Sequence, residues 1–318
     1  MTTLTSSKYS PPASLLVRHL GLVKKYDPSR DLSKLARSHA AEHPSSAPLQ
    51  LARLECEVEQ RSSDLGDVFE RTVKAVSHVN ANEEKDVRKV WFTWTAYTEE
   101  ESADSELDLT WTKILTLSSK LNQSTTHTAL LGRYFISTLQ RSSPLPALRT
   151  IDSFAKYRPT EDIYAIALVA IAVYTKEPYH DLTKLYERWK SAARTKDGRV
   201  EAALAWAGWL LENKKAHLAA QIVDSVRRED EADVERRWKE MCDEAEERGA
   251  EAEGSELEQL ERKLRAIGWG GLATPEGISR PVEIEESESE DEDEDEEMEE
   301  GEGDSDEDSD SGSMDINM

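Results

Sequence analysis

Apolar residues recur at helical spacing across almost all of the first 265 residues, and the helices that they predict come in pairs. Equivalent apolar positions of the first helices, Leu54, Trp94 and Tyr134, lie 40 residues apart. In the second helices of later pairs the step is 35 and then 37 residues, at Asp152, Glu187 and Asp224. A two-helix repeat of about 34 to 45 residues is typical of an α-solenoid, because one hairpin cannot bury its apolar stripe alone. The sequence therefore predicts an all-α protein, an α-α superhelix of stacked hairpins.

Changes in composition divide the chain into five predicted parts. The charged segments Asp230–Gly249 and Glu256–Ile267 are expected to form a helix pair that closes the open end of the array. The run Ile163–Tyr174 is apolar and partly β-branched, but its twelve residues favour a buried helix over a strand. The predicted parts are an N-terminal helical hairpin (1–46), helical repeats (47–227), charged capping helices (228–267), a linker (268–281) and a disordered acidic tail (282–318).

The charge of the chain is concentrated in its last part. No Lys or Arg follows Arg280, and 21 of the 65 acidic residues lie between Glu283 and Asp315, which leaves 44 acidic against 40 basic residues before them. The body is therefore nearly neutral, and no single basic face for nucleic acid is evident. Two compatible interpretations of the tail remain: a segment that keeps the protein soluble, or one that attracts basic proteins. Three serines have an acidic residue three positions on and are candidate phosphorylation sites: Ser287, Ser289 and Ser305.

The sequence contains none of the motifs that would indicate catalysis or a bound cofactor. Cys56 and Cys242 are isolated, which fits a reducing compartment and gives neither a disulfide framework nor a zinc site. His39 and His43 are four residues apart, but Pro44 follows at once and the other histidines are scattered. Neither a secretory signal nor an apolar run of membrane-spanning length is present. We therefore expect a non-enzymatic, soluble protein without cofactor, metal, membrane contact or small-molecule substrate.

Two stretches resemble the half-a-TPR (HAT) repeat. One runs from Leu51 to Glu55 and continues at Asp67 to Arg71, and the other spans Asp181 to Trp189 with its aromatic-Glu-Arg step. Aromatic residues at the first-helix positions extend the resemblance to other repeats. It implies that the following residues are structural positions of the repeat: Leu54, Glu55, Phe69, Glu70, Arg71, Trp91, Trp94, Tyr97, Tyr134, Tyr186, Glu187, Arg188 and Trp206.

A narrower resemblance covers about residues 45–245. The stretch from Leu145 through Arg158-Pro159 to the Tyr186-Glu187-Arg188 helix is similar to the C-terminal half of the HAT-repeat proteins associated with the U3 small nucleolar RNA. The resemblance implies a nucleolar scaffold in pre-rRNA processing within the small-subunit processome. Its partners would be protein subunits of that ribonucleoprotein, among them β-propeller proteins, with U3 RNA and pre-rRNA contacted mainly indirectly. Residues 1–46 depart from this family, whose members begin with a helical region rich in Glu and Arg.

Other interpretations remain open at the level of the sequence. A HAT scaffold of the spliceosome or of the mRNA 3′-end machinery fits the same repeats. A chaperone of histones or ribosomal proteins fits the acidic tail. The tryptophans are read first as core residues, because they alternate with Leu and Ile at helical spacing, although exposed aromatic rings also stack on unpaired bases.

Overall fold

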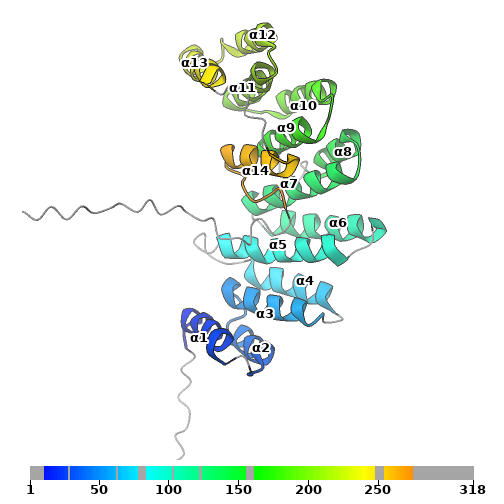
Figure 1. Ribbon diagram of the computed structural model, residues 1–318, viewed down its shortest axis with the longest axis vertical. Coiled ribbons are helices and arrows are strands. Elements are labelled where there is room, and N and C mark those ends of the chain that lie inside the picture. The colour runs from blue at the N-terminus through cyan, green and yellow to red at the C-terminus, as the bar shows by residue number, and fades with distance from the viewer. Residues whose placement is uncertain are drawn as a thin grey trace, which may run out of the picture. The chain divides into compact units, whose positions relative to one another are not determined.

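The computed structural model describes residues 11–27, 29–61, 64–77, 84–101, 104–121, 124–154, 161–247 and 254–274. These residues form fourteen α-helices and no β-strand, so the all-α prediction is confirmed (Figure 1). The chain separates into one unit of residues 1–281 and a second of residues 282–318. All described residues belong to the first unit. The predicted tail with Ser287, Ser289 and Ser305, and the linker beyond Thr274, lie outside the described residues.

The helices follow one another with short connections. In chain order they are α1 (Ala13–Tyr26), α2 (Leu32–Glu42), α3 (Ala47–Glu59), α4 (Leu65–Val76), α5 (Glu84–Glu101), α6 (Asp104–Lys120), α7 (Ser124–Arg141), α8 (Pro144–Phe154), α9 (Asp162–Tyr174), α10 (Tyr179–Ala192), α11 (Lys196–Glu212), α12 (Ala216–Val226), α13 (Glu231–Glu247) and α14 (Glu256–Ala266).

The helices pack as hairpins stacked in chain order. Each odd-numbered helix from α1 to α11 contacts the even-numbered helix that follows it. Each also contacts the next odd-numbered helix, so that α1, α3, α5, α7, α9, α11 and α13 form a continuous series. Since a hairpin buries its apolar side only against its neighbours, this arrangement accounts for the repeated apolar pattern of the sequence.

The buried faces follow from the spacing of the apolar residues. Helix α4 buries Val68, Phe69, Val73 and Val76, which fall on one side of a helix of 3.6 residues per turn. Helix α9 is apolar on nearly every side, because it packs against α7, α10 and α14 together. The prediction that Ile163–Tyr174 is a buried helix and not a strand is therefore confirmed.

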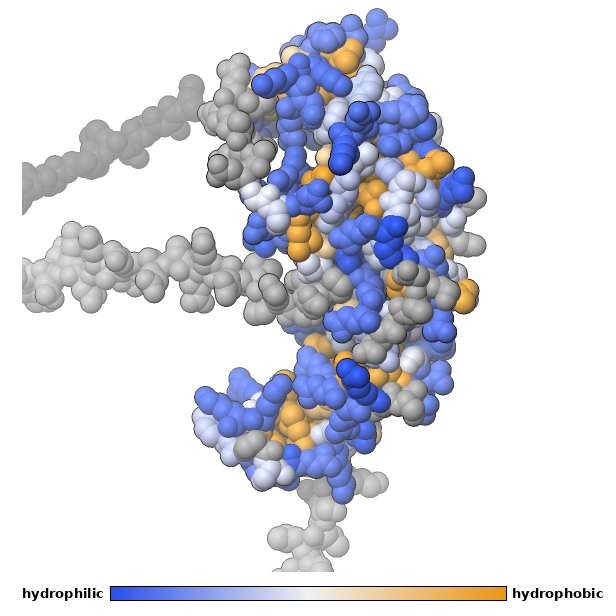
Figure 2. All heavy atoms as spheres, turned by 45° about the vertical axis from the view of Figure 1, so that its right-hand side comes forward, coloured by the Kyte–Doolittle hydropathy of each residue, from blue (hydrophilic) through white to orange (hydrophobic). Residues whose placement is uncertain are grey.

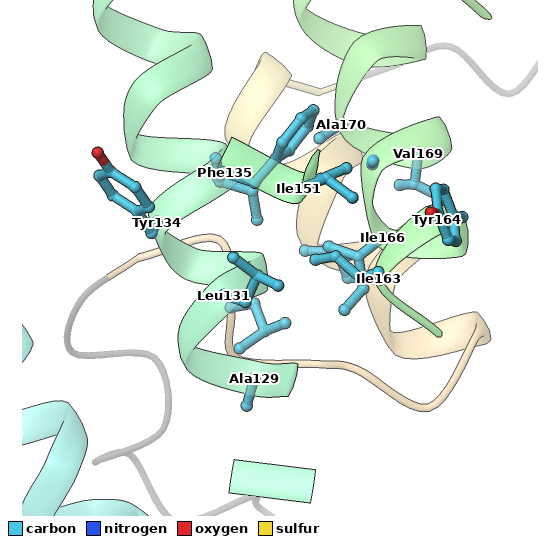
Figure 3. Packing of buried hydrophobic residues seen from close by; sticks show 14 of the residues in the cluster. Ala129, Leu131, Tyr134, Phe135, Ile151, Ile163, Tyr164, Ile166, Val169 and Ala170 are labelled. Carbon is cyan, nitrogen blue, oxygen red and sulfur yellow. The ribbon is translucent and has the colours of Figure 1, made fainter. Parts of the chain in front are cut away.

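Most of the buried apolar residues belong to one hydrophobic cluster that extends from α3 to α14. In its middle, Leu131 and Phe135 of α7 meet Ile151 of α8 and Ile163 and Ile166 of α9 (Figure 3). A second, small cluster joins α1 and α2 to one side of α3; its buried members are Leu16, Leu20, Ala36, Leu49 and Cys56. The first hairpin thus shares little of the main core.

The last two helices do not lie together as the sequence led us to expect. Helix α13 packs on α11 and α12, whereas α14 packs chiefly on α9, in the middle of the array (Figure 1). Leu260 and Leu264 supply the buried side of α14. Leu272 then lies beside Gly132 of α7, where a Cβ atom would stand 3.0 Å from Cδ1 of Ile166 on α9 and 3.3 Å from Cδ1 of Leu272. The absence of a side chain at Gly132 therefore makes room first for Ile166 of α9 and also for Leu272 in the segment after α14.

A buried arginine holds that segment in place. The Nη1 atom of Arg133, on α7, donates to the backbone oxygens of Leu272 and Ala273 at 3.2 and 2.7 Å. Its Nη2 atom lies 2.5 Å from the carboxylate of Glu99 on α5. Because a buried guanidinium needs partners for its protons, this one side chain ties α5, α7 and the chain after α14 together.

Candidate protein-binding surface

The aromatic and apolar repeat-signature residues lie in the main core. Their side chains are buried, except that of Tyr97, which is partly buried against the core; the buried set is Leu54, Phe69, Trp91, Trp94, Tyr134, Tyr186 and Trp206. Rings buried in this way are not available for stacking on bases. The structure therefore places these residues between helices and not on a binding surface.

Stacked aromatic pairs connect successive hairpins at three junctions: α4 with α5, α6 with α7, and α10 with α11. Phe69 of α4 stacks on Trp94 of α5 with ring centroids 5.8 Å apart and parallel planes. Less parallel stacks join α6 to α7 through Trp111 and Tyr134, at 5.2 Å with planes inclined by 28°, and α10 to α11 through Tyr186 and Trp206, at 6.2 Å and 20°. Such pairs contribute about 0.5–1.5 kcal/mol beyond the burial of their area. At these three junctions the aromatic positions of the repeat therefore help to hold successive hairpins together.

Charged signature residues also contact neighbouring helices. Glu70 of α4 pairs with Lys113 of α6 and with Lys74 of its own helix, each at 2.6 Å. Hydrogen bonds from Lys113 and then from Lys74 lower the pKa of Glu70 to about 2. Arg188 of α10 pairs with Asp152 of α8 at 2.9 Å. The Glu and Arg positions therefore act partly within a helix and partly between neighbouring hairpins.

The remaining charged signature residues make no ion pair or hydrogen bond to another hairpin among the residues that the structure describes. Arg71 donates to the backbone oxygen of Asp67, one turn earlier in α4. Glu187 is exposed on α10. Glu55 of α3 borders the groove described below.

Several ion pairs between helices were missed by the sequence analysis. Arg199 of α11 pairs with Glu229 after α12 at 3.0 Å, and Arg237 of α13 pairs with Glu201 of α11 at 2.7 Å. The pair between Glu99 and Arg133 is also of this kind. Partners in these pairs lie 30–36 residues apart, which is about one repeat. Opposite charges at that spacing are the feature of the sequence from which the pairs could be predicted. It is weak in a chain where a third of the residues are charged.

A serine and a histidine meet at the junction of α6 and α7. The Oγ atom of Ser118 lies 2.7 Å from Nδ1 of His127, and both side chains are fully buried. The Ser118 hydroxyl also donates to the backbone oxygen of Leu115. Since a hydroxyl has a single proton, it then accepts from His127 Nδ1. We interpret the pair as a buried polar contact between two helices.

The histidines of α2 face different partners. His39 is buried and its Nε2 atom lies 3.2 Å from Nδ1 of His19 on α1, whereas the ring of His43 lies 2.8 Å from the backbone oxygen of Pro11.

Burial raises the pKa of the Cys56 thiol. Over the described ranges, no three His, Cys, Asp or Glu side chains are grouped so that they would hold a metal ion. In the same part of the chain, no helix has the length and apolar character needed to cross a membrane.

The described surface has a groove of about 190 Å³ between the first three helices. Figure 2 shows apolar surface surrounded by hydrophilic side chains at this end of the described unit. No local sequence pattern reveals this groove, because it depends on how α1 and α2 pack on α3. Its lining residues are Val17, Leu20, Gly21 and Lys24 of α1, Leu32 and Ala36 of α2, and Ala52, Glu55, Cys56 and Glu59 of α3.

Comparison with known proteins adds no identification. No protein-family model, no curated protein and no solved structure matches this chain.

Proposed function

We propose that this chain is a non-catalytic scaffold for pre-rRNA processing in the nucleolus, as part of the U3 small nucleolar ribonucleoprotein of the small-subunit processome. The observation that carries the proposal is the stacking of α-hairpins in chain order, with aromatic pairs and ion pairs from one hairpin to the next. The assignment to this ribonucleoprotein rests on the resemblance of the Phe69-Glu70-Arg71 and Tyr186-Glu187-Arg188 steps to HAT repeats.

The mechanism of such a scaffold is geometric. Hairpins stacked into an α-α superhelix present helix surfaces in fixed relation, and protein subunits bound to different hairpins are held in fixed relation too. β-Propeller proteins are partners of suitable size and rigidity. Because residues 1–280 carry 44 acidic and 40 basic residues, little counterion release would drive binding of RNA. Contact with U3 RNA and pre-rRNA is therefore assigned mainly to the partners.

Affinity purification of the tagged full-length chain, with identification of the recovered proteins and RNA, tests this proposal. We expect U3 RNA together with pre-ribosomal protein subunits. Recovery of splicing or mRNA 3′-end factors instead would replace the nucleolar assignment by another HAT scaffold.

The acidic segment supports a second candidate, a chaperone for histones or ribosomal proteins. The 21 acidic residues after position 282 would attract basic proteins through salt-sensitive association. Repeating the purification with residues 282–318 deleted separates the two functions. A scaffold keeps its complex without the segment, whereas a chaperone loses its basic clients.

A further inference from the structure

The junction between the first two hairpins contains an open space. Helices α3, α5, α7 and α9 are joined by large buried side chains, but α1 and α3 are separated by the groove of about 190 Å³. Its floor is apolar, formed by Val17 and Leu20 of α1, Leu32 of α2 and Ala52 of α3. A space of this size accepts one or two apolar side chains and loses dispersion energy while it is empty of them.

Carboxylates line one wall of the groove. Glu55 and Glu59 are one turn apart on α3, and neither makes an ion pair with any residue in the described part of the chain. Burial, in spite of the nearby charges of Lys24 and Lys89, raises the pKa of Glu55, and the charge of Glu59 adds to the rise. The side chain of Glu55 still reaches solvent, so protein surrounds this carboxylate without covering it. A cationic partner brought beside it would be stabilised by a local dielectric lower than that of water.

The same chain already holds an amphipathic helix on its odd-numbered helices. Helix α14 packs on α9 by burying Leu260 and Leu264, four residues apart, and Lys263 pairs with Glu212 of α11 at 2.6 Å. In this contact, two leucines one turn apart pack on an apolar surface, and the lysine beside them pairs with a glutamate at the border of that surface. The groove between α1 and α3 offers the same combination of an apolar floor and glutamate carboxylates, with Lys24 as its one lining cation, and without an occupant from the described residues.

We propose that this groove binds an amphipathic helix of a partner protein, which inserts an apolar side chain between α1 and α3 and places a lysine or arginine between Glu55 and Glu59. This mode of recognition, a helix in a groove read by apolar residues one turn apart, is common in protein complexes. The proposal rests on the protein-binding part of the proposed function. It does not depend on the assignment to pre-rRNA processing.

The test uses the full-length chain and a synthetic helical peptide of about 15 residues, long enough to form several turns. The peptide carries leucines at i and i+4, lysines beside them, a fluorophore and one photoreactive leucine. Fluorescence anisotropy gives its affinity, and mass spectrometry locates the residues that it labels on irradiation. We expect labelling within Val17–Lys24 and Ala52–Glu59.

Two variants and a matched control locate the binding. The double variant Glu55→Gln with Glu59→Gln removes the carboxylates and is expected to weaken binding about tenfold. The variant Ala52→Trp fills the groove and is expected to weaken binding to a similar extent. The control, Glu106→Gln with Glu177→Gln, changes the net charge equally at two exposed sites and should leave the affinity unchanged. Circular dichroism verifies that each variant is folded.

Binding to the acidic segment 282–318 is the main competing outcome. It would be the same in all variants, would disappear at about 0.5 M salt, and would place the label after residue 281. Labelling confined to that segment, or equal affinity of the wild-type chain and both groove variants, overturns the proposal. If the peptide does not bind the groove but the purification recovers U3 RNA, only the groove proposal is rejected. If the peptide binds the groove but no U3 RNA is recovered, only the nucleolar assignment is rejected.

Discussion

The first hairpin and the hairpin of α5 and α6 are both built from amphipathic helices, but their interiors differ. Helix α5 buries Trp91, Phe92 and Trp94 in the main cluster, where Trp94 stacks on Phe69 of α4 and on Trp91 of its own helix. Helix α1 buries only Leu16, Leu20 and Val23 and contributes to the small cluster. Helices with similar patterns therefore differ in how strongly they are coupled to the rest of the array.

Polar contacts supply part of what the first hairpin lacks in buried area. Arg37 of α2 pairs with the buried carboxylate of Glu57 on α3 at 3.0 Å, and the side-chain amide of Gln50 donates to the backbone oxygen of Ala40. These contacts fix the direction of α2 on α3. Because they add little net free energy each, we expect α1 and α2 to open before the larger core does.

The largest effect is expected in the main core. Replacing Trp94, which is 2% exposed, by alanine removes its stacking on Phe69 and Trp91 and leaves a cavity. We expect a loss of about 3–5 kcal/mol in the free energy of unfolding, measured by urea denaturation followed by circular dichroism. Leu109→Ala, at a position that is 72% exposed, is the control and should change stability by less than about 0.5 kcal/mol. A small effect of the Trp94 variant would mean that the hairpins are not held by these rings.

The next largest effect is expected at the buried arginine of α7. Arg133→Met removes the charge that pairs with Glu99 and both hydrogen bonds to the chain after α14. We expect a loss of about 3 kcal/mol, since one buried charge is left without its partner. Limited proteolysis should then cleave around α14 before it cleaves the remaining helices. Unchanged protection of α14 would show that Leu260 and Leu264 suffice to hold it.

In the small cluster, Leu20→Ala is expected to cost about 2 kcal/mol, because the neighbouring groove allows partial collapse around the lost side chain. The effect should be confined to α1 and α2. Hydrogen exchange that increases equally in α5 and α7 would contradict the distinction between the two clusters.

A smaller, pH-dependent effect is expected in the same hairpin. Burial, together with the nearby ring of His19, lowers the pKa of His39, with Arg30 and His43 acting in the same direction and Glu42 against it. The unfolded chain then binds a proton more readily than the folded chain. The stabilisation is complete above about pH 6.5 and decreases as the pH falls below that value towards the lowered pKa. Thermal unfolding at about pH 7.5 and 5.5 measures it, and His39→Gln should reduce the dependence.

The smallest effect is expected at the partly exposed ion pair of Glu70 with Lys113. Lys113→Met should cost less than about 1 kcal/mol, because solvent and salt screen the pair. Since the pKa of Glu70 is lowered from 4.5 to about 2, its contribution is complete above about pH 4.5 and is lost as the pH falls towards 2. Carbon-detected NMR titration of the carboxylate checks the value. A pKa near 4.5 for Glu70 would show that its pair with Lys113 does not help to hold the hairpins together.

The sequence predicted the helices better than their distant contacts. Apolar spacing such as that of Val68, Phe69 and Val73 depends on local geometry, so the pairing of neighbouring helices follows from it. The segment after α14 is held by Arg133, 139 residues before Leu272, and no local pattern encodes such a contact. The groove could not be predicted either. Glu55 was selected as a repeat position, but its place at a gap depends on how α1 packs.

The scaffold proposal requires that the hairpins from α3 onward act as one body through their shared core. Hydrogen exchange with mass spectrometry, at increasing but sub-denaturing urea, tests this requirement most directly. We predict that α1 and α2 lose protection first and that α3 to α11 lose it together, because they share one hydrophobic cluster. Separate loss of protection by each hairpin along the array would contradict the account, since independent hairpins would not hold bound partners in fixed relation.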